Sequence, residues 1–96
     1  MELTSKQRAA LRGMANTLDA VLFIGKDGIT ENTIKEAYDA LEARELIKCA
    51  LQNGCELSAR EACTILCEKV HAHPVQCIGK RFVIYKQSRQ NKKIEL

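Results

Sequence analysis

Residues 20–51 hold, in order, a short apolar run, the pattern of a capped helix and a second strand pattern. The first run, A-V-L-F-I, is apolar throughout and ends at a glycine, which predicts a central strand covered on both faces. Thr30 precedes apolar residues at helical spacing that end near Arg44, and L-I-K-C-A-L at 46–51 predicts the next strand. Because a helix joins the two strands, we expect a parallel βαβ unit with a right-handed crossover.

Two further helices are predicted by capping boxes, in which a Ser or Thr side chain and a Glu or Gln three residues later cap each other's backbone. The first box predicts a helix over residues 5–16, and the second predicts a helix over 59–71 that Pro74 closes off. Strands at 75–78 and 82–86 then form a hairpin, so the complete order is αβαβαββ in a single α/β domain. The two capping boxes are Thr4 with Gln7 and Ser58 with Glu61.

Composition favours a cytoplasmic protein. The start of the chain has no apolar signal core, and no run of about 18 apolar residues predicts a membrane span. The five cysteines form an odd set without a C-x-x-C pair, which is typical of free thiols in a reducing compartment. We therefore expect no membrane contact and no disulfide framework.

Positive charge is concentrated toward the end of the chain. Residues 71–96 carry six basic side chains against one acidic, whereas residues 31–70 carry five against eight. Such an asymmetry can fold into one basic face, as in nucleic-acid binders. Residues 87–96 are polar and basic without periodicity, so we predict a mostly mobile tail after the domain at 1–86, which Ile94 and Leu96 could tie down.

The loop G-K-D-G, residues 25–28, joins the first strand to the second helix. Its glycines allow positive φ and close approach of another backbone, and the free amides at the helix start favour a phosphate. Lys26 adds a cation, whose charge Asp27 partly cancels. The loop fits contact with a nucleic-acid backbone, but a tight strand-to-helix turn explains Gly25 and Gly28 equally well.

Other basic side chains are candidate nucleic-acid contacts only if the fold brings them close to this loop. Exposed basic residues at helical spacing more often form a solvated face of a helix. Arg8 and Arg12 lie one turn apart on the first helix, and Lys80, Arg81 and Lys86 surround the last hairpin. The complete set of candidate contacts is Gly25, Lys26, Asp27, Gly28, Lys6, Arg8, Arg12, Lys80 and Lys86.

Metal binding and catalysis have weaker support. Cys63, Cys67 and His71 follow one another at helical spacing, with His73 close behind, and could in principle gather a zinc ion. However, Cys63 falls on the apolar side of its helix, so at least one thiol should point into the core. No catalytic signature is present, and we expect no metal, no cofactor and no enzymatic activity.

Four stretches together resemble the bacterial YhbY proteins, which are stand-alone members of the CRM family, named after chloroplast RNA splicing and ribosome maturation. The likeness covers nearly the whole chain in register. It implies a compact RNA-binding domain with a four-stranded mixed sheet, like the C-terminal domain of the third bacterial translation initiation factor. The stretches are T-S-K-Q-R-A-A-L-R, F-I-G-K-D-G-I-T-E-N-T-I-K-E, A-L-E-A-R-E-L-I-K and V-Q-C-I-G-K-R-F-V-I-Y-K.

The resemblance also implies a function and a set of contacts. Bacterial members associate with precursors of the large ribosomal subunit, so the expected partner is ribosomal RNA, bound by a monomer that assists assembly. Gly25, Lys26 and Gly28 match the family's loop, which is compared with the loop that clamps nucleotide backbone in KH domains. Arg12, with the basic residues before it, matches the basic first helix, and Lys80 matches a basic residue of the last hairpin.

Two further expectations concern how a partner is recognised. Phe23 and Phe82 lie in predicted strands, so base stacking should contribute little and RNA shape should dominate. The alternative to RNA binding is a module that docks on a ribosomal protein or assembly factor through the acidic second helix. The acidic residues of that helix include Glu31, Glu36, Asp39 and Glu42.

Overall fold

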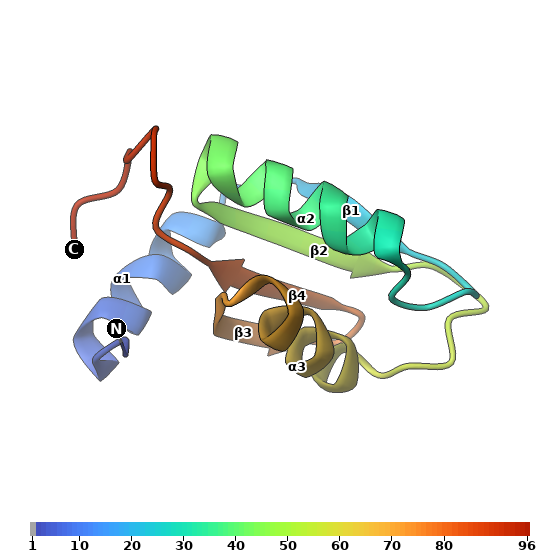
Figure 1. Cartoon of the computed structure of the whole chain (residues 1–96). Coiled ribbons are helices and arrows are strands. Elements are labelled where there is room, and N and C mark those ends of the chain that lie inside the picture. Colours follow the sequence, from blue (N-terminus) through green and yellow to red (C-terminus); the bar gives the residue numbers. More distant parts are fainter. Residues whose placement is uncertain (1) are drawn as a thin grey trace.

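The computed structural model describes residues 2–96, which form three helices and one four-stranded sheet (Figure 1). The predicted order αβαβαββ is confirmed, and each predicted boundary is right to within two residues. The helices are α1 (Ser5–Ala15), α2 (Glu31–Arg44) and α3 (Ala59–Val70), and the strands are β1 (Ala20–Ile24), β2 (Leu46–Leu51), β3 (His73–Ile78) and β4 (Arg81–Tyr85).

The helices begin where the capping signals predict. Both predicted capping boxes are present, and Thr30 caps α2 through a third box that it forms with Thr33. The end of α3 differs in mechanism from the prediction. His71 adopts the left-handed conformation at φ 58° and turns the chain out of the helix, while Pro74 lies inside β3. Pro74 is tolerated there because β3 is an edge strand with a bulge between Pro74 and Gln76.

The sheet has the strand order β1-β2-β4-β3, with β1 and β2 parallel and the other two pairs antiparallel. The mixed sheet is confirmed, but the prediction that β1 is a central, doubly covered strand is wrong. It is an edge strand whose Leu22 and Ile24 are buried while Val21 and Phe23 are exposed. A five-residue apolar run does not reveal which of its faces a helix will cover.

Each face of the sheet carries its own core. Helices α2 and α3 cover one face together, and α1 covers part of the opposite face near the start of β2 (Figure 1). The larger core includes Leu22, Ile24, Leu41, Ile47, Cys49, Leu66, Phe82 and Ile84. The smaller core includes Leu3, Leu11, Ala15, Leu46, Val75, Val83 and Tyr85.

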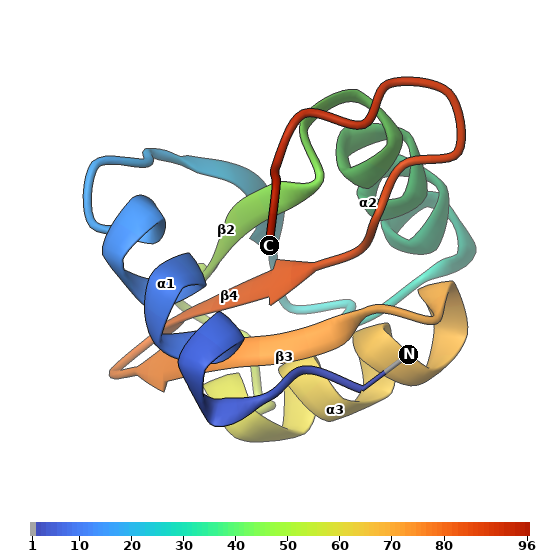
Figure 2. The same cartoon turned by 90° about the vertical axis from the view of Figure 1, so that its left-hand side faces the viewer.

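After β4 the tail loops beside α2 and returns toward the sheet (Figure 2). The fully buried carboxylate of Glu45 accepts hydrogen bonds from the backbone amides of Ser88 (2.7 Å), Lys93 and Ile94 (2.7 Å). Ile94 also packs against the smaller core. The tail therefore has a defined anchor in this structure, although its predicted mobility stays a prediction.

Within residues 2–96, no helix is both long enough and apolar enough to cross a membrane.

Candidate nucleic-acid interface

The G-K-D-G loop is a tight turn in which the amide of Gly28 donates to the carbonyl of Gly25 at 3.0 Å. Gly28 has a φ of +69°, a conformation that strains any residue with a Cβ. Gly25 lies close to the neighbouring loop, because a Cβ added to it would stand 3.1 Å from Oε1 of Gln52. Lys26 is exposed within this turn. Gly28 is therefore required by the backbone conformation, whereas Gly25 is favoured by the limited space beside Gln52.

Three connections converge around this turn: the G-K-D-G loop, the β2–α3 loop over residues 52–58, and the β3–β4 hairpin (Figure 1). Lys80 in the hairpin donates from Nζ to Oδ1 of Asn53 at 3.4 Å. On the other side, a Cβ added to Gly54 would lie 3.8 Å from Cβ of Lys26. The fold therefore brings Lys26 and Lys80 to the same loop at one end of the sheet.

This end of the sheet carries two exposed lysines together with acidic side chains that offset part of their charge, including Glu31 in the first turn of α2. Lys26 and Lys80 are both exposed, and neither forms an ion pair with any of the residues that the structure describes. Asp27 is also exposed and offsets part of the charge. The first amides of α2 begin three residues after Gly28, so their partial positive charge adds to that of the lysines.

The basic residues of α1 lie elsewhere. Helix α1 packs at the end of the sheet away from the G-K-D-G loop (Figure 1), where Nε of Arg8 donates to the carbonyl of Pro74 at 3.2 Å. Arg12 follows one turn later and is exposed, as is Lys6, the second residue of the helix. The structure therefore does not join the basic ridge of α1 directly to the loop.

Lys86 directly follows the second strand of the hairpin, at the end of the sheet opposite to Lys80. Strand β4 separates the two residues by six positions, which is roughly 20 Å in an extended chain. The ammonium of Lys86 lies over the ring of Tyr38 on α2, 4.6 Å from its centroid. The candidate contacts thus form one basic cluster of Lys26 and Lys80 at one end of the sheet and a second of Lys6, Arg8 and Arg12 on α1 at the other end, while Lys86 lies apart beside α2.

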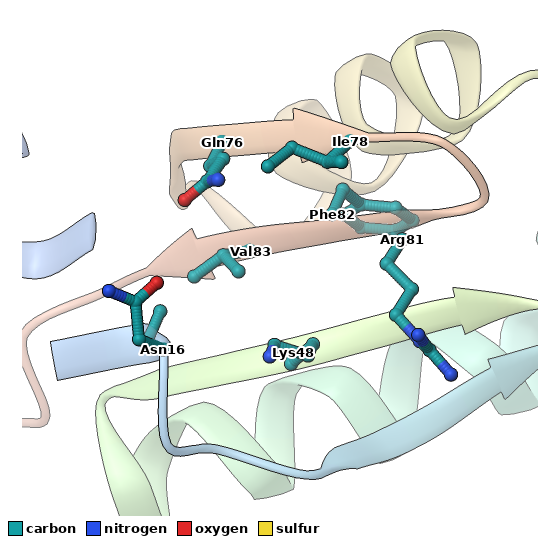
Figure 3. Close-up of a pocket in the computed structure, with 8 residues that line it drawn as sticks. Asn16, Lys48, Gln76, Ile78, Arg81, Phe82 and Val83 are labelled. Carbon is teal, nitrogen blue, oxygen red and sulfur yellow. The ribbon is translucent and has the colours of Figure 1, made fainter. Parts of the chain in front are cut away.

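Part of the sheet between these clusters is not covered by α1. We name this surface the open sheet face and define it by Val21, Phe23, Lys48, Ala50, Gln76, Ile78 and Arg81. Phe23 is 56% exposed and Ile78 is 65% exposed. An open hollow of about 240 Å³ lies over the part of this face formed by β2, β3 and β4, with Asn16 of the α1 end at one side and Lys48, Ile78 and Arg81 around it (Figure 3).

No pattern in the sequence predicts this exposed face. Phe82 is buried, as expected for a residue of a covered strand, but the same expectation for Phe23 is wrong. Alternation along β1 hides Leu22 and exposes Phe23, and a strand of five apolar residues does not show that alternation. Only the position of α1 on the sheet decides which apolar residues remain in solvent.

Cys63, Cys67 and His73, three of the candidate zinc ligands, take part in packing. Among residues 2–96, no group of three or more metal-ligating side chains comes together. Cys63 and Cys67 are buried in the larger core, and the ring of His73 stacks on Tyr85 with centroids 6.5 Å apart. Burial raises the pKa of Cys49 to about 12, so this thiol stays protonated and unreactive at neutral pH.

Comparison with known proteins gives consistent matches along the chain. The model of the CRS1 / YhbY (CRM) domain matches residues 3–86. "Probable RNA-binding protein YqeI" of Bacillus subtilis is 42% identical over 94 residues, which cover 98% of each chain. An "RNA-binding protein" of Haemophilus influenzae is 31% identical over 90 residues, covering 94% of this chain and 91% of the relative. The solution structure of SAV1595 from Staphylococcus aureus superposes with a TM-score of 0.82 at 43% identity and covers 99% of both chains.

Proposed function

The chain belongs to the CRS1/YhbY (CRM) domain family, and on that premise we propose that it binds RNA and assists assembly of the large ribosomal subunit. The RNA-binding names of its relatives support the first part of the proposal. The observation that carries the site is the pair of exposed, unpaired lysines, Lys26 and Lys80, beside a glycine turn and a helix start.

In this mechanism, RNA phosphates occupy the end of the sheet where the three connections converge. Backbone amides at the start of α2 and the ammonium groups of Lys26 and Lys80 supply the positive charge. Gly28 gives the loop a shape that lets the RNA backbone approach closely. Asp27 weakens the local field, so affinity depends on additional contacts, which Arg8 and Arg12 provide to a second segment of the RNA.

The double variant Lys26→Ala, Arg12→Ala tests this surface. Each cluster loses one exposed cation, so binding to protein-free ribosomal RNA at physiological salt should weaken while the melting temperature stays nearly unchanged. With four or five phosphate contacts, log K against log salt should have a slope of roughly −3 to −4 in the wild type, and the variant's slope should be shallower by about 1.5. Filter binding across a salt series gives both quantities.

Lys35→Ala is the matched control, because Lys35 is an exposed cation on α2 and outside both clusters. It should bind RNA like the wild type. If the double variant also binds normally, the proposed surface is wrong.

The same assay separates RNA binding from docking on a ribosomal protein through the acidic α2. That alternative has less structural support, because Asp39 pairs with Lys35 at 2.9 Å and Glu36 accepts a hydrogen bond from Asn32 at 2.9 Å. A docking module would not bind RNA freed of protein.

A further inference from the structure

We propose that the open sheet face binds unpaired RNA bases, with the ring of Phe23 as the stacking platform. This inference rests on the proposed function, because it assumes an RNA held by the basic clusters. It assigns a second kind of contact to the protein, made to bases and not to phosphates.

The strand register places four side chains of this face in one row across the sheet. Phe23 pairs with Ala50, Ala50 with Arg81, and Arg81 with Ile78. Their neighbours Leu22, Cys49, Phe82 and Cys77 point the other way, into the larger core or against it. Because neighbouring strands lie about 4.8 Å apart, the row is roughly 14 Å wide.

This row combines an aromatic ring, a cation and apolar edges. Phe23 is more than half exposed, and its pairing partner on β2 is the small residue Ala50. Arg81 is exposed on the next strand, and guanidinium groups stack on bases as aromatic rings do. Aromatic side chains on a sheet are the usual platform for unpaired bases, since every base has a π-face.

The next row supplies polar groups. Lys48 on β2 and Gln76 on β3 are both register partners of Val83 on β4. Their side chains line the hollow in front of the sheet (Figure 3). A lysine can contact phosphate, and an amide can hydrogen-bond a base edge. A second hollow at the border of the face is lined by Asp19, Val21 and Arg44 together with Lys48.

Charge and position favour RNA over a protein as the occupant. Arg81 is the charged side chain in the row that holds Phe23. The two basic clusters lie beyond the opposite ends of the face. Phe23 stands two residues before Gly25, so a nucleotide whose phosphate rests on the loop has its base near the ring. Bases of a duplex are stacked on one another and cannot reach it, so the ligand must be unpaired.

The experiment compares two fluorescent probes, a 12-nucleotide unpaired RNA and a fully paired RNA duplex, by anisotropy with the full-length protein. Phe23→Ala and Phe23→Leu should weaken binding of the unpaired RNA about tenfold or more, since each loses one base stack. Phe23→Tyr keeps an aromatic face and should bind like the wild type. All three should bind the duplex within twofold of the wild type, because the duplex uses only the phosphate contacts.

Leu96→Ala is the control for loss of an exposed apolar side chain and should change neither affinity. If Phe23→Ala proves unstable, Phe23→Leu is compared with Phe23→Tyr to test stacking. Both variants keep a large side chain at this edge-strand position, but only Phe23→Tyr keeps an aromatic ring.

The outcomes separate the two proposals. If the Phe23 variants bind unpaired RNA normally while Lys26→Ala, Arg12→Ala weakens both probes, the stacking site is wrong, the proposed function stands, and the face is left for a protein partner. Equal weakening of duplex and unpaired RNA by Phe23→Ala also contradicts stacking. If only the Phe23 variants lose binding, the loop contact is wrong. A wild type that binds neither probe overturns both.

Discussion

Gly28 and Gly25 differ in how much the loop depends on them. At Gly28 the backbone has a φ of +69°, so an alanine is strained although its Cβ would find ordinary contact distances. At Gly25 the added Cβ would crowd only the far end of the flexible Gln52 side chain. Gly28→Ala should therefore lower the free energy of unfolding by about 1 kcal/mol, and Gly25→Ala by less. Urea denaturation measures both, and a larger loss for Gly25→Ala would contradict this reading.

Single residues also mark how far the sequence predicted the site. The glycine spacing and the capping residue Thr30 are local signals, so the loop and the helix behind it could be found without a structure. Lys80 is a candidate both as a basic residue beside the hairpin turn and through the family resemblance. The exposure of Phe23 and the remote position of Lys86 depend on how α1 and the hairpin dock, which no local pattern encodes.

At the scale of elements, the C-terminal tail is held by one buried carboxylate. Glu45 has a positive φ of 66°, where glycine is the usual residue. Its side chain explains the exception, because it accepts three backbone hydrogen bonds from the tail. Burial opposes ionisation of Glu45, but the amides of Lys93, Ser88 and Ile94 together hold its pKa below the usual value.

Glu45→Gln should release this anchor. We expect a loss of about 2 kcal/mol in the free energy of unfolding at pH 7, because hydrogen bonds to a charged acceptor are replaced by weaker ones. A lowered pKa means that the carboxylate stabilises the fold above its unfolded pKa of about 4.3, and that this stabilisation is lost as pH falls through the folded pKa. The difference between variant and wild type should therefore shrink in acid.

Urea denaturation at pH 7 and at pH 3 checks this prediction, with the exposed Glu68→Gln as the matched control. Hydrogen exchange at Ser88 and Ile94 should accelerate in Glu45→Gln. An undiminished stability difference in acid, or unchanged exchange, would show that the tail is not held by the carboxylate.

The elements themselves followed from the sequence because their signals are local. Capping boxes and helical spacing define α1 and α3 to within a residue. The edge position of β1 and the anchor of the tail are long-range properties. Glu45 resembles any acidic residue near a helix end until β4 and the tail pack around it.

At the scale of the whole molecule, the charge asymmetry of the sequence becomes two basic clusters on a body of 36 × 26 × 22 Å. Lys26 and Lys80 form one cluster, and Lys6, Arg8 and Arg12 of α1 form the other. Two clusters separated along the sheet suit an RNA that crosses the molecule, with the open sheet face on its path. If RNA contacted only the G-K-D-G loop through Lys26, a second basic cluster at the other end of the sheet would have no role in binding.

The measurement that tests the proposed role most directly is sucrose-gradient sedimentation of a cell lysate, with the protein located by immunoblot. The wild type and Lys35→Ala should comigrate with precursors of the large ribosomal subunit, and Lys26→Ala, Arg12→Ala should remain at the top of the gradient. A wild type at the top would contradict the assembly role, and a double variant that comigrates unchanged would contradict the proposed RNA surface.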